Sequence, residues 1–425
     1  MQGGTLSSNE KSLGLSSRPA AEAYVARVCF KLGPPQLIGA ELEWLTYAED
    51  GDRPSLEHLA AALGDYAPRS IAPDSSALTL PGGSAVTIEP GGQIELSSSP
   101  HASVTELQNA LDSDSRLVTS VMEAGGIYMA SVPADTEREA HRVLVLPRYC
   151  AMENRFTTIG PFGKLMMCNT AAAQVSVDAG VDRAEVAARW EMLEAIGPAF
   201  VAAFASSPRL RGAPEGAWAS QRMRTWLELD DSRTEVPATG DPVADYARWA
   251  LDVPLLCIRS EGESWEAPFG ATFSDWLAGD VAALSGRQPT TADLDYHLTT
   301  LFPHVRACGH LEIRYLDAQP DGQWVVPASA FESLLSTPNV TEAATALAHR
   351  TAGRWIDAAQ SGLADADLRE TAVELLRLSA SVGGDHSALL SAASERCRRG
   401  ESPEPGDAVT RSMNAGHSTS KETVS

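Results

Sequence analysis

The sequence predicts an α+β fold, in which helices pack on a mostly antiparallel sheet. Separated segments alternate apolar and polar residues with the period of a β-strand. Segments with helical periodicity lie between these strands and not in a block of their own. One-sided alternation is typical of antiparallel sheets, because buried parallel strands are apolar on both faces. With 425 residues, 44% of them hydrophobic, the chain can bury a large core.

The composition excludes several classes of protein. A net charge of −23 argues against a nucleic-acid partner, since phosphate groups are bound by clustered cations. No apolar run reaches the length of a transmembrane helix, so we expect no membrane association. The first 20 residues lack the hydrophobic region of a signal peptide, which predicts a cytoplasmic protein. The six cysteines are scattered without zinc-like spacing, so reduced thiols are expected.

Both ends of the chain are polar and rich in small residues. We expect residues 1–20 and 400–425 to be disordered. Residues 21–330 contain all the motifs considered below and form the predicted catalytic core. Residues 331–399 are predicted to be a helical region packed on that core.

Three helices have clear boundary signals. Ser103 and Glu106 have the spacing of a capping box, and the apolar stripe that follows ends at Gly125. A second helix begins at Asp182, and Pro198 is expected to kink or divide it. A third helix ends at Gly383.

Four strand-like segments, at residues 34–47, 86–99, 171–180 and 306–317, each have one apolar and one polar face. In the second segment, residues 90–92 (Pro-Gly-Gly) predict a bend or bulge. The polar faces carry Glu41 and Glu43, then Glu89, Gln93 and Glu95, then Gln174 and Ser176, and finally Glu312 and Arg314.

The acids on these faces point to a metal site if the strands share one sheet. Two carboxylates about 4 Å apart repel by roughly 4 kcal/mol at an effective dielectric constant of 20, so converging acids need a cation or raised pKa values. Carboxylate ligands favour Mg²⁺ or Mn²⁺ over Zn²⁺, and protein-bound Mg²⁺ commonly carries nucleotide phosphates. The chain has no Walker A or Rossmann motif. The residues therefore indicate a phosphoryl-handling enzyme, and the alternative is a solvated sheet face.

Four motifs in order resemble the glutamate–cysteine ligases of the plant and actinobacterial type. They are "IGAELEW", "PGGQIELSSSP", "MMCNTAAAQVSVD" and "LEIRYLD", and the similarity covers about residues 37–317. The resemblance is strongest to the actinobacterial branch that serves ergothioneine biosynthesis. It implies a glutamine-synthetase-like core, in which a curved, mostly antiparallel sheet forms a funnel. It also implies a ligase that uses ATP to join the glutamate γ-carboxylate to the amine of L-cysteine through γ-glutamyl phosphate, and we expect a monomer.

The matching motifs imply roles for individual residues. The metal ligands would be Glu41, Glu43, Glu95 and Glu312, with Glu89 a weaker candidate. Arg314, together with Glu312, would be catalytic by stabilising the transferring phosphoryl group; alternatively, Arg314 forms a salt bridge that organises Glu312. The candidate substrate-binding residues are Gln93, Arg148, Tyr149, Asn169, Gln174, Arg222 and Arg233. For the amides the alternative is a satisfied position inside the sheet, and for the arginines a surface ion pair.

The chain also departs from the family pattern. Ser176 occupies a position where plant enzymes have asparagine and related bacterial enzymes histidine, and the paired regulatory cysteines of plants have no counterpart. We interpret His101, His304 and His310 as packing or hydrogen-bonding residues. Two other functions fit the same scaffold: a glutamate ligase with another amine acceptor, and a non-catalytic protein that binds a nucleotide or an amino acid.

Overall fold

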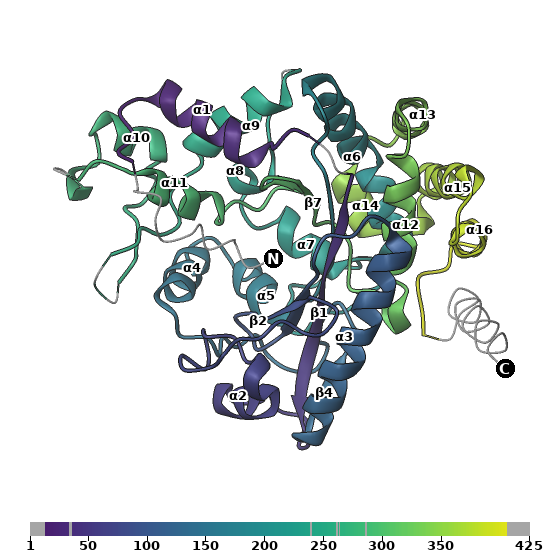
Figure 1. The fold of residues 1–425 in the computed structure, drawn as a ribbon, viewed down its shortest axis with the longest axis horizontal. Coiled ribbons are helices and arrows are strands. Elements are labelled where there is room, and N and C mark those ends of the chain that lie inside the picture. The colour runs from purple at the N-terminus through teal and green to yellow at the C-terminus, as the bar shows by residue number, and fades with distance from the viewer. Residues whose placement is uncertain are drawn as a thin grey trace.

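A computed structural model of the chain describes residues 13–33, 36–238, 240–260, 262, 264–284 and 287–405. It contains a seven-stranded sheet surrounded by helices, with the long strand β1 running through the middle of the molecule (Figure 1). Every strand pair is antiparallel. This confirms the predicted α+β class with a mostly antiparallel sheet and helices outside it.

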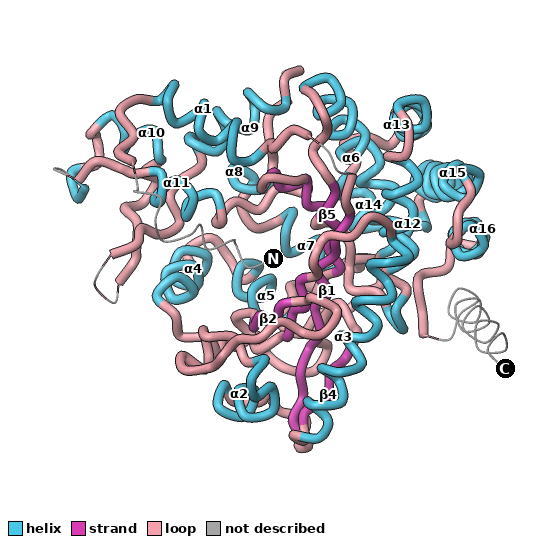
Figure 2. Tube along the Cα trace, viewed as in Figure 1, coloured by secondary structure: helices cyan, strands magenta, loops and turns pink. Residues whose placement is uncertain are grey.

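The strands follow the spatial order β2-β3-β1-β5-β7-β6, and β4 pairs with the far end of β1. Figure 2 shows these strands as one narrow band between the helices. Their bounds are β1 Ile38–Ala48, β2 Ala85–Ile88, β3 Ile94–Ser97, β4 Ile127–Ala130, β5 Ala173–Val177, β6 Val305–Ala307 and β7 Leu311–Ile313. The fourth predicted segment is thus the second arm of a hairpin, and β4 and β6 were not predicted.

The apolar face of the sheet forms part of the main hydrophobic core. Leu42 on β1 lies opposite Leu96 on β3, and Val175 on β5 lies opposite Ile313 on β7. All four side chains are at most 5% exposed. Helix α3 (Val104–Ala124) contributes Leu107 and other apolar residues to the same core. Burial of this face leaves the opposite, polar face free for chemistry.

Helices before residue 300 flank the sheet, and those after it gather on one side (Figure 1). The longer helices are α1 Arg18–Cys29, α2 Leu56–Leu63, α3 Val104–Ala124, α4 Pro147–Thr157, α5 Phe162–Asn169, α6 Arg183–Phe204, α7 Gln221–Leu227, α9 Pro242–Asp252, α11 Thr291–Leu298, α12 Val325–Leu334, α13 Pro338–Ala348, α14 Trp355–Ser361, α15 Ala366–Val382 and α16 Ser387–Arg398. Two short helices are α8 Asp231–Thr234 and α10 Phe273–Ala278. None of the described helices is long and apolar enough to cross a membrane.

The three helices with sequence signals form as predicted at their boundaries. Ser103 accepts a hydrogen bond from the amide of Glu106, and Asp182 caps α6 in the same way. The predicted capping box is only half formed, because the Glu106 carboxylate accepts from the amide of Ala102. Gly383 ends α15 with a positive φ. Pro198 lies inside α6, which continues to Phe204, so the proline does not divide the helix.

The chain ends and the domain boundary need a more precise description. Leu15 is buried and α1 begins at Arg18, so residues 13–20 are ordered, in contrast to the predicted disorder of residues 1–20. Residues 1–12 and 406–425 lie outside the described part of the chain. The boundary expected after residue 330 falls within α12, which packs against both α3 and α15.

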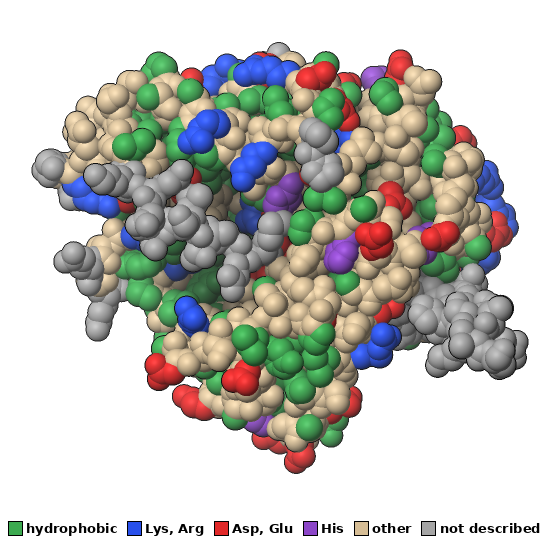
Figure 3. Space-filling model, viewed as in Figure 1, with side chains coloured by type: hydrophobic (Ala, Val, Ile, Leu, Met, Phe, Trp, Pro, Cys, Tyr) green, Lys and Arg blue, Asp and Glu red, His purple; other side chains and the backbone are tan. Residues whose placement is uncertain are grey.

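On the face drawn in Figure 3, acidic side chains gather at the lower end, over α2 and the far end of β1.

Candidate active site

The strand register places the predicted acids on one face of the sheet. Glu43 on β1 lies directly opposite Glu95 on β3. Glu41 lies between Ser97 on β3 and Gln174 on β5, and Ser176 on β5 lies opposite Glu312 on β7. Residues that are directly opposite across an antiparallel pair project to the same side. The structure therefore brings acids from three separate segments onto one surface, with Gln174 and Ser176 of β5 between them.

Glu89 and Gln93 belong to the turn between β2 and β3. The amide of Glu89 donates to the carbonyl of Gln93 at 2.8 Å, which closes the turn. Only glycine fits at Gly91, because a Cβ there would lie 2.3 Å from the carbonyl oxygen of Cys168. The Gln93 side chain donates to the carbonyl of Thr170 at 2.8 Å and is 2% exposed. Its Nε2 atom thus holds the turn against the end of α5.

Gln174 lies between the two acids of β1. Its Nε2 atom is 3.4 Å from Oε2 of Glu41 and 3.3 Å from Oε1 of Glu43. The backbone amide of Ala172 donates to the other oxygen of Glu43 at 2.8 Å. On the neighbouring strand, the hydroxyl of Thr87 donates to Glu95 at 2.6 Å. These donors orient the carboxylates from within the sheet.

Burial and mutual repulsion make most of these acids hard to ionise. Burial, followed by the charges of Glu95 and Glu312, raises the pKa of Glu41 to about 7. Burial and neighbouring glutamates also raise the pKa values of Glu43 and Glu95. Burial raises the pKa of Glu89 too, although the nearby Arg148 opposes this. A bound cation would relieve this repulsion.

Glu312 has a different environment from the other acids. Arg306 on β6 lies directly opposite it and donates to both of its carboxylate oxygens, at 2.7–2.9 Å. Arg314 lies 3.5 Å from its Oε1 atom. Burial acts to raise the pKa of Glu312, but Arg306 and then Arg314 outweigh it and hold that pKa at about 2. Glu312 is therefore ionised at neutral pH.

Arg306 was not identified from the sequence. The missed signal was a hairpin: β6 and β7 are joined by Cys308, Gly309 and His310, and Gly309 has a φ of +93°. Had residues 305–313 been interpreted as two short strands around this glycine, Arg306 would have been placed opposite Glu312.

Arg314 and Arg222 lie on the ring of one buried tryptophan. The guanidinium of Arg314 is 4.9 Å from the centre of the Trp226 ring, and that of Arg222 is 5.6 Å from it. Arg222, on α7, also donates to the backbone carbonyl of Arg314 at 2.8 Å. The Nε atom of Arg314 is buried and has no hydrogen-bond partner among the described residues. Arg314 thus keeps a donor available for an anion.

Arg148 and Tyr149 lie at the start of α4, close enough to Glu89 for their charges to interact. Arg148 donates to the backbone carbonyl of Thr299 at 2.8 Å. Its Nε atom is buried without a partner among the described residues. Burial, and then the charge of Glu89, raises the pKa of Tyr149, which keeps the phenol protonated.

Two other predicted residues make only structural contacts. Asn169 is fully buried; it accepts from Arg53 and donates to the carbonyl of Arg138 at 2.7 Å. Arg233 is also fully buried and donates to the carbonyls of Thr300 and Pro254, at 2.9 and 2.7 Å. In both cases the hydrogen-bond partners are residues outside the acidic face, so the structure does not bring Asn169 and Arg233 together with the glutamates.

The acidic face suits a hard divalent cation. Its donors are oxygens from Glu41, Glu43, Glu89 and Glu95, and three of these acids repel each other while buried. Mg²⁺ and Mn²⁺ prefer such oxygen ligands. A cavity of about 460 Å³ lies between β1 and α3; it is lined by Leu42, Glu43 and Trp44 of β1, by Gln108 and Arg116 of α3, and by Gln319 and Trp324. Of the predicted acids, Glu43 borders this cavity.

Comparison with known proteins relates the chain to one family. The model of glutamate-cysteine ligase family 2 (GCS2) matches residues 37–417. The glutamate–cysteine ligase EgtA of Mycolicibacterium smegmatis is 36% identical over 373 residues, covering 86% of this chain and 84% of that protein. The chloroplastic glutamate–cysteine ligase of Medicago truncatula is 32% identical over 56% of this chain and 48% of its own length. A solved glutamate–cysteine ligase from Francisella tularensis, in complex with AMP, has a TM-score of 0.48 and 12% identity, over 91% of this chain and 86% of that one.

Proposed function

The chain belongs to glutamate–cysteine ligase family 2, and we propose that it uses ATP to join the γ-carboxylate of L-glutamate to the amine of L-cysteine. The product is γ-glutamylcysteine, which would serve ergothioneine biosynthesis. The observation that carries the proposal is the convergence of four glutamates on one sheet face, with Arg314 beside one of them, in a chain of this family.

The need for ATP follows from the chemistry of the substrates. A carboxylate does not react with an amine, because its oxygen is a poor leaving group. Transfer of the γ-phosphoryl group of ATP to the glutamate carboxylate gives an acyl phosphate and ADP. The amine of cysteine then attacks the acyl carbon, the amide bond forms, and phosphate leaves with the former carboxylate oxygen. The nitrogen loses a proton in this step.

We propose that the acidic face holds Mg²⁺ or Mn²⁺ through Glu41, Glu43, Glu95 and Glu312, with Glu89 as a weaker ligand. Such an ion supplies charge neutralisation for the triphosphate and the transferring phosphoryl group. The raised pKa values of Glu41, Glu43 and Glu95 support this assignment, because they reflect repulsion that a cation would relieve. Gln174 keeps two of the ligands in position.

Arg314 is our candidate for the side chain that contacts the transferring phosphoryl group. Its position beside Glu312 supports this role, as does its Nε atom, which no described residue hydrogen-bonds; Trp226 and Glu312 restrict its movement. A preorganised cation lowers the barrier because it does not need to reorient as charge develops. Among the candidates for binding substrate, Arg148 and Tyr149 lie near Glu89, while Gln93 and Asn169 make contacts inside the protein.

A phosphate-release assay tests the proposal. The protein is incubated with ATP, Mg²⁺ and glutamate, together with cysteine, alanine or ammonia in separate reactions. We expect turnover with cysteine to exceed turnover with the other amines. Equal turnover with all three would contradict the cysteine assignment and favour a ligase with another acceptor. No glutamate-dependent phosphate release with any of them would favour a non-catalytic binding protein.

The remaining proposals concern the whole chain. We propose that residues 21–330 form the catalytic core, that the helical region after it packs on this core, and that the protein acts as a monomer in the cytoplasm. The contacts of α15 with α6 and α12 support the packing of the helical region. Size-exclusion chromatography with light scattering tests the oligomeric state, since a monomer has a mass of 45.0 kDa and a dimer would have twice that mass.

A further inference from the structure

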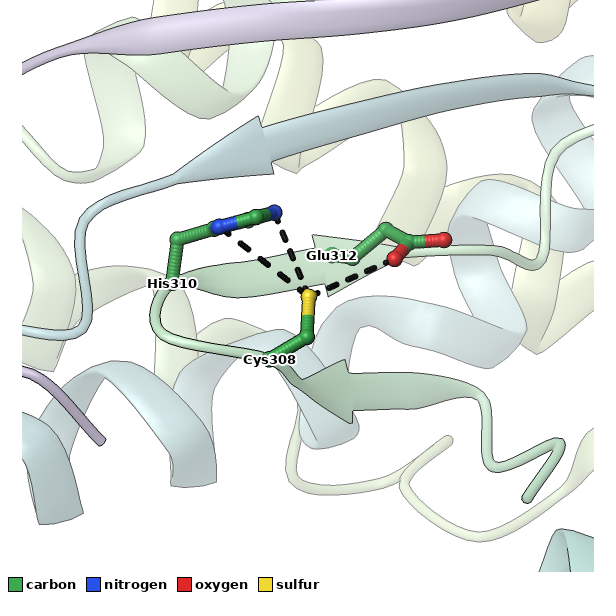
Figure 4. A group of neighbouring side chains, drawn as sticks. All are labelled: Cys308, His310 and Glu312. Atoms are coloured by element: carbon green, nitrogen blue, oxygen red, sulfur yellow. Dashed lines mark hydrogen bonds between the residues drawn. The ribbon is translucent and has the colours of Figure 1, made fainter. Parts of the chain in front are cut away.

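The turn between β6 and β7 groups three side chains that the proposed reaction does not use together. Cys308 and His310 flank Gly309, and Glu312 follows two residues later on β7. Figure 4 shows the imidazole of His310 and the carboxylate of Glu312 both directed toward the sulfur of Cys308. One ligand atom from each residue lies within 4.8 Å of the other two. Their donors are one sulfur, one nitrogen and one oxygen.

We propose that Cys308, His310 and Glu312 form a second metal site, selective for Zn²⁺ or a chemically similar ion, which inhibits the enzyme when occupied. This ligand set differs from the all-oxygen set of the acidic face, because thiolate and imidazole favour zinc over magnesium. The inhibition rests on the proposed ligase function, whereas the binding does not.

The distances fit tetrahedral coordination. With Zn–S near ~2.3 Å and Zn–N near ~2.0 Å, two ligands at a tetrahedral angle lie about 3.5 Å apart. The sulfur of Cys308 is 3.3 Å from Nε2 of His310 and 3.5 Å from Oε2 of Glu312. An ion can therefore be bound with small side-chain movements. The thiol proton is released to solvent as the Zn–S bond forms, and the fourth position is left for water.

The hairpin explains why these side chains meet. The amide of Cys308 donates to the carbonyl of His310 at 3.0 Å, which closes a three-residue turn. The positive φ of Gly309 allows this turn, and the Gly309 amide is bound by the carbonyl of Cys29 at 2.8 Å. Cys308 is exposed, so an ion has access to its sulfur. The site is thus preformed by backbone contacts.

Competition for Glu312 explains the inhibition. The Oε2 atom that faces Cys308 is the same atom that accepts from Arg306 at 2.7 Å. An ion at the turn would take this oxygen and place a second positive charge near Arg306. Only the Oε1 atom of Glu312, 3.5 Å from Arg314, would then remain for the catalytic metal. Occupation of the turn site therefore competes with assembly of the acidic face.

Cobalt binding tests the site without any activity measurement. Co²⁺ replaces Zn²⁺ in such sites and, when bound to a thiolate, gives a sulfur-to-metal charge-transfer band in the near ultraviolet. We expect this band in the full-length wild type, its loss in Cys308→Ser, and a decrease in Co²⁺ affinity of at least tenfold in His310→Ala. Cys150→Ser is the matched control, because Cys150 is the other described cysteine that is not buried, and this variant should keep the band. An absent band in the wild type, or an unchanged band in Cys308→Ser, would overturn the proposal.

A second measurement tests inhibition. Phosphate release is followed with 2-aminobutyrate as the amine, since cysteine itself would bind the metal. Micromolar Zn²⁺ should inhibit the wild type and the Cys150→Ser variant, while Cys308→Ser should keep its activity at the same Zn²⁺ concentration. Equal inhibition of all three would contradict the inhibitory role. A cobalt band in a protein without glutamate-dependent turnover would instead leave the site in place and refute the proposed ligase function.

Discussion

Glu43 on β1 lies directly opposite Glu95 on β3, so two acids project from paired positions on the same face of the sheet. Like charges in this arrangement destabilise a sheet. Burial, and then the charge of Glu89 and of the partner acid, raises the pKa of Glu43. Such a repulsive pair can be retained in a fold when a bound cation neutralises it.

Replacement of either acid of this pair should stabilise the metal-free protein but weaken its affinity for Mg²⁺. In EDTA, Glu43→Gln or Glu95→Gln should raise the free energy of unfolding by ~1 kcal/mol, because a repulsive pair is removed. Affinity for Mg²⁺, measured by its effect on turnover, should fall by roughly 10- to 100-fold or more. Glu49→Gln is the control, because Glu49 is exposed just past the end of β1. Lower stability in EDTA for both variants would contradict the repulsion.

Glu41 should make the stability of the metal-free protein depend on pH. Burial and Glu95 raise its pKa from 4.5 to about 7 in the folded state. The protonated form is therefore favoured on folding, and this stabilisation is complete below pH 4.5 and is lost as the pH rises through 7. In urea unfolding with EDTA, Glu41→Gln should gain stability over the wild type between pH 5 and 8, by up to about 3 kcal/mol. Saturating Mg²⁺ should remove the gain; a difference that is constant with pH would refute the shifted pKa.

The Arg306–Glu312 pair should have the opposite pH dependence to Glu41: it should stabilise the fold at neutral pH and less so in acid. Arg306→Ala leaves a buried carboxylate without its main partner and should cost about 3 kcal/mol. The pKa of Glu312 is held at about 2, below its ordinary value of 4.5, so the pair stabilises the fold above pH 4.5 and less as the pH falls toward 2. The difference in the free energy of unfolding between the wild type and Arg306→Ala, measured in urea, should thus become smaller in acid.

A second variant separates the pair from the packing of Arg306. Adding Glu312→Gln to Arg306→Ala should recover part of the lost stability, because the carboxylate that lost its main partner is then replaced by a neutral amide. If the double variant were as unstable as the sum of the single variants, the contribution of Arg306 would come from packing alone.

Arg148 and Arg233 should differ in what they do for glutamate. Arg233→Lys cannot reproduce the two bonds to the carbonyls of Thr300 and Pro254, so it should lose about 1–3 kcal/mol of stability with an unchanged KM for glutamate. Arg148→Lys should raise that KM roughly tenfold, because a lysine cannot hold a carboxylate with two parallel bonds, and it should also lose stability because the bonds of Arg148 to Thr299 are lost. Steady-state kinetics with matched thermal unfolding distinguishes them, and a raised KM in the Arg233 variant alone would reverse the assignment.

Local patterns predicted part of this site. The alternation around Glu41 and Glu43 requires only that successive side chains of a strand point to opposite faces, and that rule holds without tertiary contacts. The same applies to the caps at Ser103 and Asp182, whose partners lie within three residues. The role of Arg233 was not decided at this level, because an arginine near two aspartates suits a ligand site as well as a buried structural position.

The sequence by itself determined the composition of the two sheet faces, boundaries of three helices and the acidic character of the site. Only the tertiary structure decided which residues meet: Glu43 with Glu95, Arg306 with Glu312, and Cys308 with His310. The physical reason is the range of the interactions. The face of a strand to which a side chain points, and the residue that caps a helix, depend on backbone geometry over a few residues. Strand register, in contrast, depends on hydrogen bonds and packing between segments that are far apart in the chain.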